Sequence, residues 1–147
     1  MTADHRALVE RYVEALNRHD YLDELVTEDV VIEYPQSGEV IRGRDNLRGL
    51  IEHSPGGPTG ADAATARGRG VDEVKVVAPL YTLVRVEGGG RTGSFEVRVH
   101  YPDGSSWWWV QIYELRAGRI AHSTHYFAQD FDAPTWRRPW VEVEQRR

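Results

Sequence analysis

The chain of 147 residues contains no cysteine, which excludes disulfide bonds, thiolate metal sites and cysteine nucleophiles. It also lacks a run of about 18 apolar residues, the length that a membrane-spanning helix requires. Its first residues, 1–11, carry charges every few positions and have no apolar core of the kind found in signal peptides. We therefore expect a cytoplasmic protein that makes no membrane contact.

A basic surface is missing as well, because the formal net charge is -5. Nucleic-acid binding depends on clustered Lys and Arg side chains, so we expect no nucleic-acid partner. The hydrophobic fraction of 40% and the charged fraction of 28% are ordinary for a globular protein. The length suits one domain that buries a real core. We expect this domain to span residues 1–128, followed by an aromatic C-terminal tail, 129–147, that packs on the domain or on a partner subunit.

Hydrophobic periodicity places helices in the first third of the chain. Apolar residues at helical spacing between Leu8 and Leu16 predict an amphipathic first helix. Asp20 is a plausible N-cap for a short second helix that ends near Thr27. A hairpin follows at 30–34 and 40–41, and a third helix at 47–51 ends before Pro55.

Strands dominate the rest of the chain. We expect them at 71–77, 81–86, 95–101, 107–115 and 120–127, after a loop at 54–70 beside the pocket mouth. Glycine-containing turns at 88–90, 103–104 and 117–118 separate the last four. Helices that precede a run of antiparallel strands indicate the α+β class. We expect a curved sheet and N-terminal helices that enclose a pocket for a small, largely apolar molecule, an expectation that depends on the resemblance described next.

Three segments carry a family resemblance: 10–17 (ERYVEALN), 31–35 (VIEYP) and 117–120 (AGRI). In this order and spacing they resemble the nuclear transport factor 2-like superfamily, and within it the ketosteroid isomerases and SnoaL-like polyketide cyclases. The resemblance spans roughly residues 5–128. It implies a cystatin-like cone, in which three N-terminal helices roof a curved antiparallel sheet around an apolar pocket that is open at one end.

The same resemblance implies roles for four residues. Tyr12 matches the tyrosine that stabilises the enolate in the isomerases, and Gln111 falls where they keep a protonated aspartic acid. Tyr34 falls at the position of their catalytic base, and a neutral tyrosine is a poor base, so we reject authentic ketosteroid isomerase activity. His125 matches an acid of the SnoaL-like proteins and is a candidate replacement base.

Each assignment has a structural alternative. Tyr12 could be a core tyrosine, His125 a hydrogen-bonded interior histidine, and Tyr34 a strand aromatic that merely packs. In strand 95–101 either the polar set with Glu96 or the apolar set with Val97 faces the pocket, and we favour the apolar set because buried charges require pairing. The further candidate substrate-binding residues are Trp109, Phe127, Val97 and Val99.

Two functional hypotheses follow. The first is binding of a small hydrophobic, carbonyl-containing metabolite with cofactor-independent proton transfer by His125, of the isomerase, cyclase or dehydratase type. The second is a non-catalytic binding or protein-assembly module. An epoxide hydrolase ranks third, because positions 100 and 125 are histidine where an Asp-Arg-Asp constellation around Arg98 is needed. We expect no metal, no cofactor, and a homodimer formed through the outer sheet face.

Overall fold

The computed structural model describes residues 4–54 and 79–147. The expected strand at 71–77 and the expected loop at 54–70, apart from Ser54, lie outside these ranges. The two α-helices are α1 (His5–Arg18) and α2 (Arg44–His53). The strands are β1 (Val26–Tyr34), β2 (Glu39–Arg42), β3 (Leu80–Gly89), β4 (Thr92–His100), β5 (Ser106–Arg116) and β6 (Arg119–Gln129), and a 3₁₀ helix, η1, spans Thr135–Trp140.

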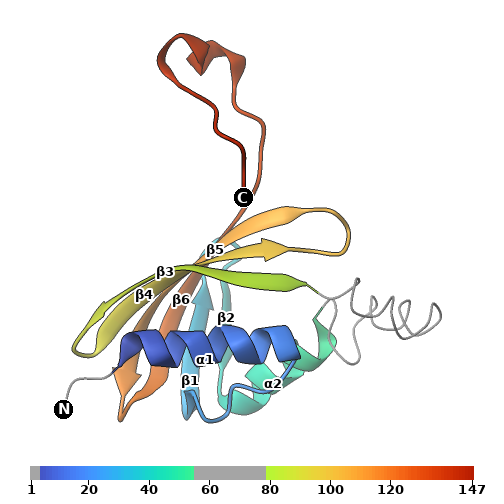
Figure 1. Ribbon diagram of the computed structural model, residues 1–147. Helices are drawn as coiled ribbons and strands as arrows, with labels where there is room; N and C mark the ends of the chain where they lie inside the picture. Colours follow the sequence, from blue (N-terminus) through green and yellow to red (C-terminus); the bar gives the residue numbers. More distant parts are fainter. Residues whose placement is uncertain (1–3, 55–78) are drawn as a thin grey trace.

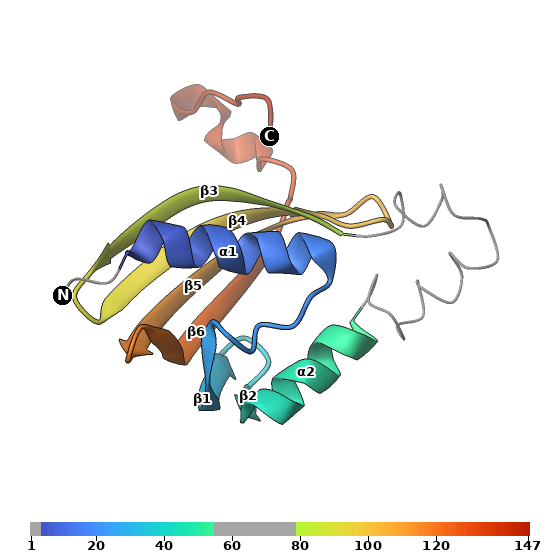
Figure 2. The same ribbon diagram turned by 60° about the horizontal axis from the view of Figure 1, so that its bottom comes forward.

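The six strands form one curved sheet in the order β2-β1-β6-β5-β4-β3. Neighbours are antiparallel, except for β1 and β6, which are parallel. Helix α1 lies across the concave face of the sheet, and α2 lies beside β1 and β2 (Figures 1 and 2). The expected α+β fold with a curved sheet and N-terminal helices is confirmed. No helix within the described ranges is long and apolar enough to cross a membrane, and the cytoplasmic location stays a prediction.

The expected second helix is wrong, so α1 and α2 are the only α-helices among the described residues. Helix α1 ends at His19, whose left-handed conformation (φ 59°) turns the chain away. A single turn follows, in which the amides of Leu25 and Val26 both donate to the carbonyl of Leu22. Because β1 already begins at Val26, the segment buries Leu22 and Leu25 without room for a helix.

The turn between β4 and β5 decides which side chains face the interior. A two-residue turn at 103–104 would pair Glu96 with Gln111, whereas the structure pairs Phe95 with Gln111 and His100 with Ser106. The longer loop shifts the register by one residue, and such a shift exchanges the two faces of a strand. The apolar set of β4 therefore faces α1, as we expected, and Arg98 faces outward.

The hydrophobic core lies between α1 and the concave face. Its centre is aromatic: the ring of Tyr12 lies 5.4 Å from Phe95 and 6.4 Å from Trp109, measured between centroids. Val97 and Val99 are 0% and 1% exposed in this core. The interior between α1 and the sheet is thus largely filled by side chains of the described residues.

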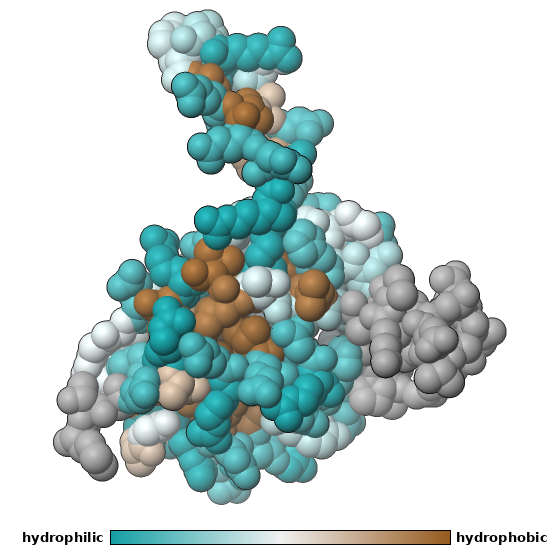
Figure 3. Space-filling view, viewed as in Figure 1, coloured by the Kyte–Doolittle hydropathy of each residue, from teal (hydrophilic) through white to brown (hydrophobic). Residues whose placement is uncertain are grey.

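Residues 130–147, which we call the arm, leave the domain after β6 and carry η1 on a projection that stands clear of the sheet (Figure 1). Phe131, Trp136 and Trp140 are 72%, 69% and 79% exposed. Hydrophobic residues are visible on this projection in the space-filling view (Figure 3). The arm therefore does not pack on its own domain except at its base, and contact with a partner subunit stays a prediction.

Candidate functional site

The structure brings together the four residues that the sequence predicts for the site. Tyr12 comes from α1, Tyr34 from the end of β1, Gln111 from β5 and His125 from β6. Gln111 Nε2 donates a hydrogen bond of 3.3 Å to the Tyr12 hydroxyl, and Gln111 pairs with His125 across the sheet. The rings of Tyr34 and His125 lie 5.2 Å apart. We call these four residues the interior cluster.

The interior cluster contains polar atoms without hydrogen-bond partners in the part of the chain that the structure describes. Gln111 Oε1, His125 Nδ1 and the neighbouring Trp109 Nε1 are all buried in this state. The other ring nitrogen of His125, Nε2, lies 2.8 Å from Ser123 Oγ. Because buried polar groups are nearly always paired, these atoms have hydrogen-bonding capacity that no described residue satisfies.

Burial also fixes the charge state of the cluster. It lowers the pKa of His125 to about 3, well below the ordinary value of 6.5. It raises the pKa of Tyr12 far above its usual range and that of Tyr34 to about 12. All three side chains are therefore neutral at physiological pH, and His125 does not keep the near-neutral pKa that its residue type suggested.

A cavity of about 580 Å³ opens next to the interior cluster, and we call it the mouth cavity. Four aromatic side chains line it together with polar and charged residues. The lining consists of Tyr34, Gln36, Ser37, Glu39, Tyr101, Pro102, Asp103, Ser105, Trp107 and Phe127. A volume of this size accommodates a small molecule of metabolite dimensions.

The predicted substrate-binding residues divide into three groups. Tyr34 and Phe127 line the mouth cavity, with their rings 5.3 Å apart in edge-to-face contact. Trp109 lies behind them, stacked on Phe127 at 5.7 Å. Val97 and Val99 belong to the hydrophobic core and do not line the cavity.

His125 is 2% exposed and does not line the mouth cavity, but it lies behind two of the cavity's walls. Its ring is 5.2 Å from Tyr34 and 6.3 Å from Phe127. Gln111 and Tyr12 are 0% and 3% exposed and lie deeper still. The mouth cavity therefore reaches the interior cluster directly at Tyr34, whereas His125 lies behind the rings of Tyr34 and Phe127.

Sequence reasoning missed the other half of the mouth cavity. Tyr101 and Trp107 form a second edge-to-face pair at 6.4 Å, and the loop between them supplies Asp103 and Ser105. Trp107 shares the face of Trp109 by strand alternation, so this residue was accessible from the sequence once Trp109 was assigned to the pocket. Asp103 could not be assigned to the cavity from the sequence, because its position depends on the length of the loop between β4 and β5.

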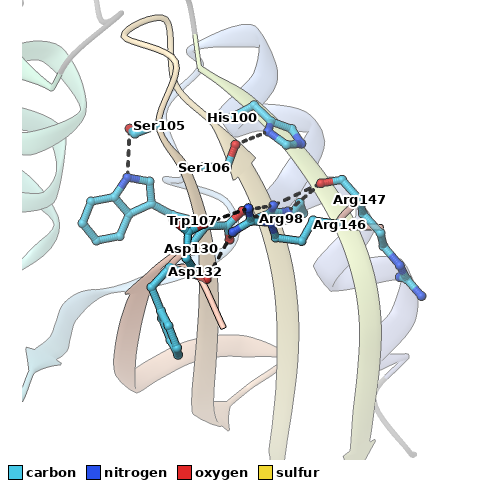
Figure 4. A network of polar contacts seen from close by, with 10 residues as sticks. Arg98, His100, Ser105, Ser106, Trp107, Asp130, Asp132, Arg146 and Arg147 are labelled. Atoms are coloured by element: carbon cyan, nitrogen blue, oxygen red, sulfur yellow. Dashed lines mark hydrogen bonds and ion pairs between the residues drawn. The ribbon is translucent and has the colours of Figure 1, made fainter. Parts of the chain in front are cut away.

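Arg98 lies on the opposite, convex face of the sheet. Its Nη1 and Nη2 donate to the two carboxylate oxygens of Asp130 at 2.7 and 2.6 Å, and its Nε and Nη2 donate to the carbonyl of Arg147 at 3.1 Å (Figure 4). The guanidinium also covers the ring of Trp108 at 4.6 Å. Arg98 thus fastens both ends of the arm and does not point toward the mouth cavity.

Within the described ranges, no group of three His, Cys, Asp or Glu residues could hold a metal ion. His122 and His125, which are close in sequence, have different surroundings. His122 Nε2 lies 3.2 Å from a carboxylate oxygen of Glu33, whereas His125 contacts Ser123 in the interior. The absence of metal and cofactor stays a prediction.

Comparison with known proteins places the chain among small domains of related architecture. The family model for the SnoaL-like domain matches residues 9–123. An NTF-2 like protein of unknown function from Burkholderia xenovorans LB400 is 31% identical, with a TM-score of 0.71 and coverage of 95% of this chain and 94% of that one. A candidate ketosteroid isomerase from Kribbella flavida DSM 17836 is 22% identical, with a TM-score of 0.73 and coverage of 97% and 90%.

An LEH-like epoxide hydrolase from M. tuberculosis has a similar fold, with 20% identity, a TM-score of 0.56 and coverage of 83% and 80%. A comparison with curated proteins gave no match. Similarity at this level of identity describes the fold, and the fold hosts several unrelated activities.

Proposed function

Since the chain belongs to the SnoaL-like domain family, we propose that it binds a small hydrophobic, carbonyl-containing molecule in the mouth cavity. The observation that supports this most is a cavity of about 580 Å³ with four aromatic walls directly against a buried, partly unpartnered polar cluster. Apolar pockets with a few convergent polar groups are the usual form of small-molecule sites. Polyketide-like or terpenoid molecules have the required chemistry.

In this proposal the aromatic walls hold the apolar body of the ligand. The Tyr34 hydroxyl is protonated at every physiological pH, because burial and the nearby charge of Glu39 raise its pKa to about 12. It is therefore a hydrogen-bond donor for a ligand carbonyl. Tyr34 orients the ligand, and Phe127 supplies apolar contact.

The test is to incubate the purified protein with a pool of hydrophobic carbonyl compounds and to identify retained and converted compounds by mass spectrometry and chromatography. We expect retention of a defined compound, with a dissociation constant about tenfold or more higher in Phe127→Ala, which removes one wall. Leu50→Ala, an exposed position on α2, is the matched control and should leave the dissociation constant unchanged. Retention of nothing by the wild-type protein would overturn the proposal.

Proton transfer is the second candidate function. In its favour, His125 Nδ1 and Gln111 Oε1 are unpartnered among the described residues, and Gln111 also donates to the Tyr12 hydroxyl. His125 would accept the proton, while Tyr12 and Gln111 would stabilise the developing oxyanion. Against it, a base whose pKa is about 3 abstracts protons from carbon weakly, so binding ranks first.

Catalysis would appear in the same experiment as a product, including one with a shifted retention time at unchanged mass. His125→Ala should then abolish turnover while circular dichroism shows a folded protein. Unchanged turnover in this variant would remove the histidine from the mechanism. An epoxide hydrolase mechanism built on Arg98 has no support, because this side chain is engaged on the convex face.

The protein is further proposed to form a homodimer through the convex face of its sheet. Ile112 and Tyr126 on this face are 51% and 44% exposed, and the arm adds exposed aromatic side chains. Contiguous exposed apolar side chains are typical of interaction surfaces. A second copy of the chain would cover both features.

A further inference from the structure

The mouth cavity has a distribution of charge that the proposed function does not use. Two carboxylates line it, Glu39 from β2 and Asp103 from the β4–β5 loop. No basic side chain is among the described residues of its lining. Among the described residues, a ligand in this cavity therefore meets aromatic rings and negative charge but no positive charge.

The aromatic walls present ring faces as well as edges. Tyr34 and Phe127 are inclined at 86° with centroids 5.3 Å apart, and Tyr101 and Trp107 at 87° with centroids 6.4 Å apart. In such edge-to-face pairs the two rings point in different directions, so an enclosed group meets faces of the ring system from more than one side. The face of an aromatic ring is negative and attracts cations, most strongly in tryptophan.

Two consecutive hydrogen bonds hold the indole ring of Trp107 in position at the cavity. Its indole Nε1 donates to Ser105 Oγ at 3.0 Å, and this hydroxyl donates to Asp103 Oδ1 at 2.6 Å (Figure 4 shows the first contact). Because the only polar hydrogen of the indole is already engaged by Ser105, the ring offers a ligand its π system. The same two hydrogen bonds tie the position of one cavity carboxylate to that of the ring.

Both cavity carboxylates act on the neighbouring phenols. The hydrogen bonds from Ser105 lower the pKa of Asp103, which is therefore ionised at neutral pH. Burial is the main cause of the raised pKa of Tyr34 and of Tyr101, and the second cause is the negative charge of Glu39 for Tyr34 and of Asp103 for Tyr101. Glu39 on β2 and Asp103 in the β4–β5 loop thus both place negative charge at the cavity lining.

We propose that the mouth cavity recognises an alkylated ammonium group, so that the ligand is an amphiphilic cation with an apolar body. The inference rests on the proposed function, because it assigns a charge to the ligand of the same cavity. An alkylated ammonium ion combines apolar methyl surface, which the rings cover, with a positive charge, which the ring faces and the two carboxylates stabilise. Anionic ligands are disfavoured by the same charges.

The experiment compares three probes of similar shape: trimethylphenylammonium, neutral tert-butylbenzene and benzenesulfonate. Binding is followed by tryptophan fluorescence and by chemical-shift changes of the indole N–H resonances. We expect the cation to bind about tenfold or more tightly than the neutral probe, with no saturable binding of the anion. Equal affinity of the cation and the neutral probe would overturn the inference and leave the proposed function standing, whereas failure of all three to bind would overturn the inference and count against both.

Two charge variants connect the preference to the cavity. In the double variant Glu39→Gln, Asp103→Asn the ratio of the two dissociation constants should fall several-fold toward one. Glu87→Gln, Glu114→Gln removes two charges from exposed positions in β3 and β5 that do not line the cavity, and should keep the wild-type ratio. An equal fall in both double variants would mean that the preference reflects net charge alone, which would overturn the assignment to this cavity.

Discussion

His125 combines complete burial with a titratable ring, which links the stability of the protein to pH. Its pKa is about 3 in the folded protein, against an ordinary value of 6.5. Between these values the unfolded chain binds a proton that the folded protein does not, so the free energy of unfolding falls as the pH falls. From pH 7 to pH 4 this loss is on the order of 3 kcal/mol.

Urea unfolding between pH 7 and pH 4 measures this loss. In His125→Gln the ring cannot titrate, so its unfolding free energy should depend less steeply on pH than that of the wild type. His53→Gln, at an exposed position on α2, should keep the wild-type slope. Equal slopes in the wild type and His125→Gln would contradict a strongly lowered pKa.

For individual residues, the sequence predicted the interior cluster better than the lining of the mouth cavity. The family resemblance assigned Tyr12, Gln111 and His125 to the site, and all three are buried in the structure. Trp107 was missed as a cavity residue although it shares the face of Trp109 by strand alternation, whereas Asp103 was missed because its place depends on how many residues the β4–β5 loop contains. One residue more or fewer in this loop shifts the register between β4 and β5 and so changes which of their side chains share a face of the sheet. Residue propensities do not determine the length of the loop.

The hairpin of β3 and β4 meets the start of α1 through two glycines. In the neutral ring of His5, Nε2 donates to the carbonyl of Gly90 at 3.1 Å, so Nδ1 accepts from the Tyr113 hydroxyl at 2.7 Å. A Cβ at Gly93 would collide with the Tyr113 ring and hydroxyl and would lie 2.9 Å from His5 Nδ1. Gly93→Ala should therefore reduce the unfolding free energy by about 1–3 kcal/mol.

Gly89→Ala is the matched control for this prediction, because a Cβ there meets nothing within 4 Å. Both variants make the same change in the same hairpin, so the difference in their urea midpoints isolates the collision from any effect on the unfolded chain. Equal midpoints would show that α1 can shift to make room.

The arm depends on the contact between Arg98 and Asp130 at its base. Arg98 is 2% exposed, and the carboxylate of Asp130 is the only acidic partner that the described residues offer it. Asp130→Asn removes the carboxylate partner of a buried guanidinium and should lower the unfolding free energy by about 3 kcal/mol, the lower end of the range for broken buried ion pairs. Asp132→Asn, at a fully exposed side chain, should change it by less than about 0.5 kcal/mol, as is usual for surface substitutions.

Elements were predicted unevenly along the chain. Long periodic segments such as 8–16 and 107–115 produced α1 and β5, whereas the six-residue segment after Asp20 formed a turn. A helix that short cannot repay the cost of its first turn, so tertiary contacts of Leu22 and Leu25 determined its conformation. The aromatic tail gave no periodic signal, and its projection from the domain follows from the contacts of Arg98.

At the scale of the whole molecule, exposed large apolar side chains lie on the convex face of the sheet and on the arm. Burial of these side chains against a second copy predicts a dimer of the 16.8 kDa chain in sedimentation velocity. Ile112→Lys, Tyr126→Lys places two charges on the convex face and should yield monomers.

Trp136→Ala, Trp140→Ala tests the contribution of the arm to the same dimer. If the arm of one copy contacts the other, this variant should raise the dimer dissociation constant at least about tenfold, since truncation of buried interface tryptophans commonly costs more than 1.4 kcal/mol. The control for the lysine substitutions on the convex face is Leu50→Lys, which places a charge at an exposed apolar position on α2 and should leave the protein dimeric. A wild-type monomer at all concentrations would contradict the assembly, and a dimer that tolerates the two lysines would assign it to another surface.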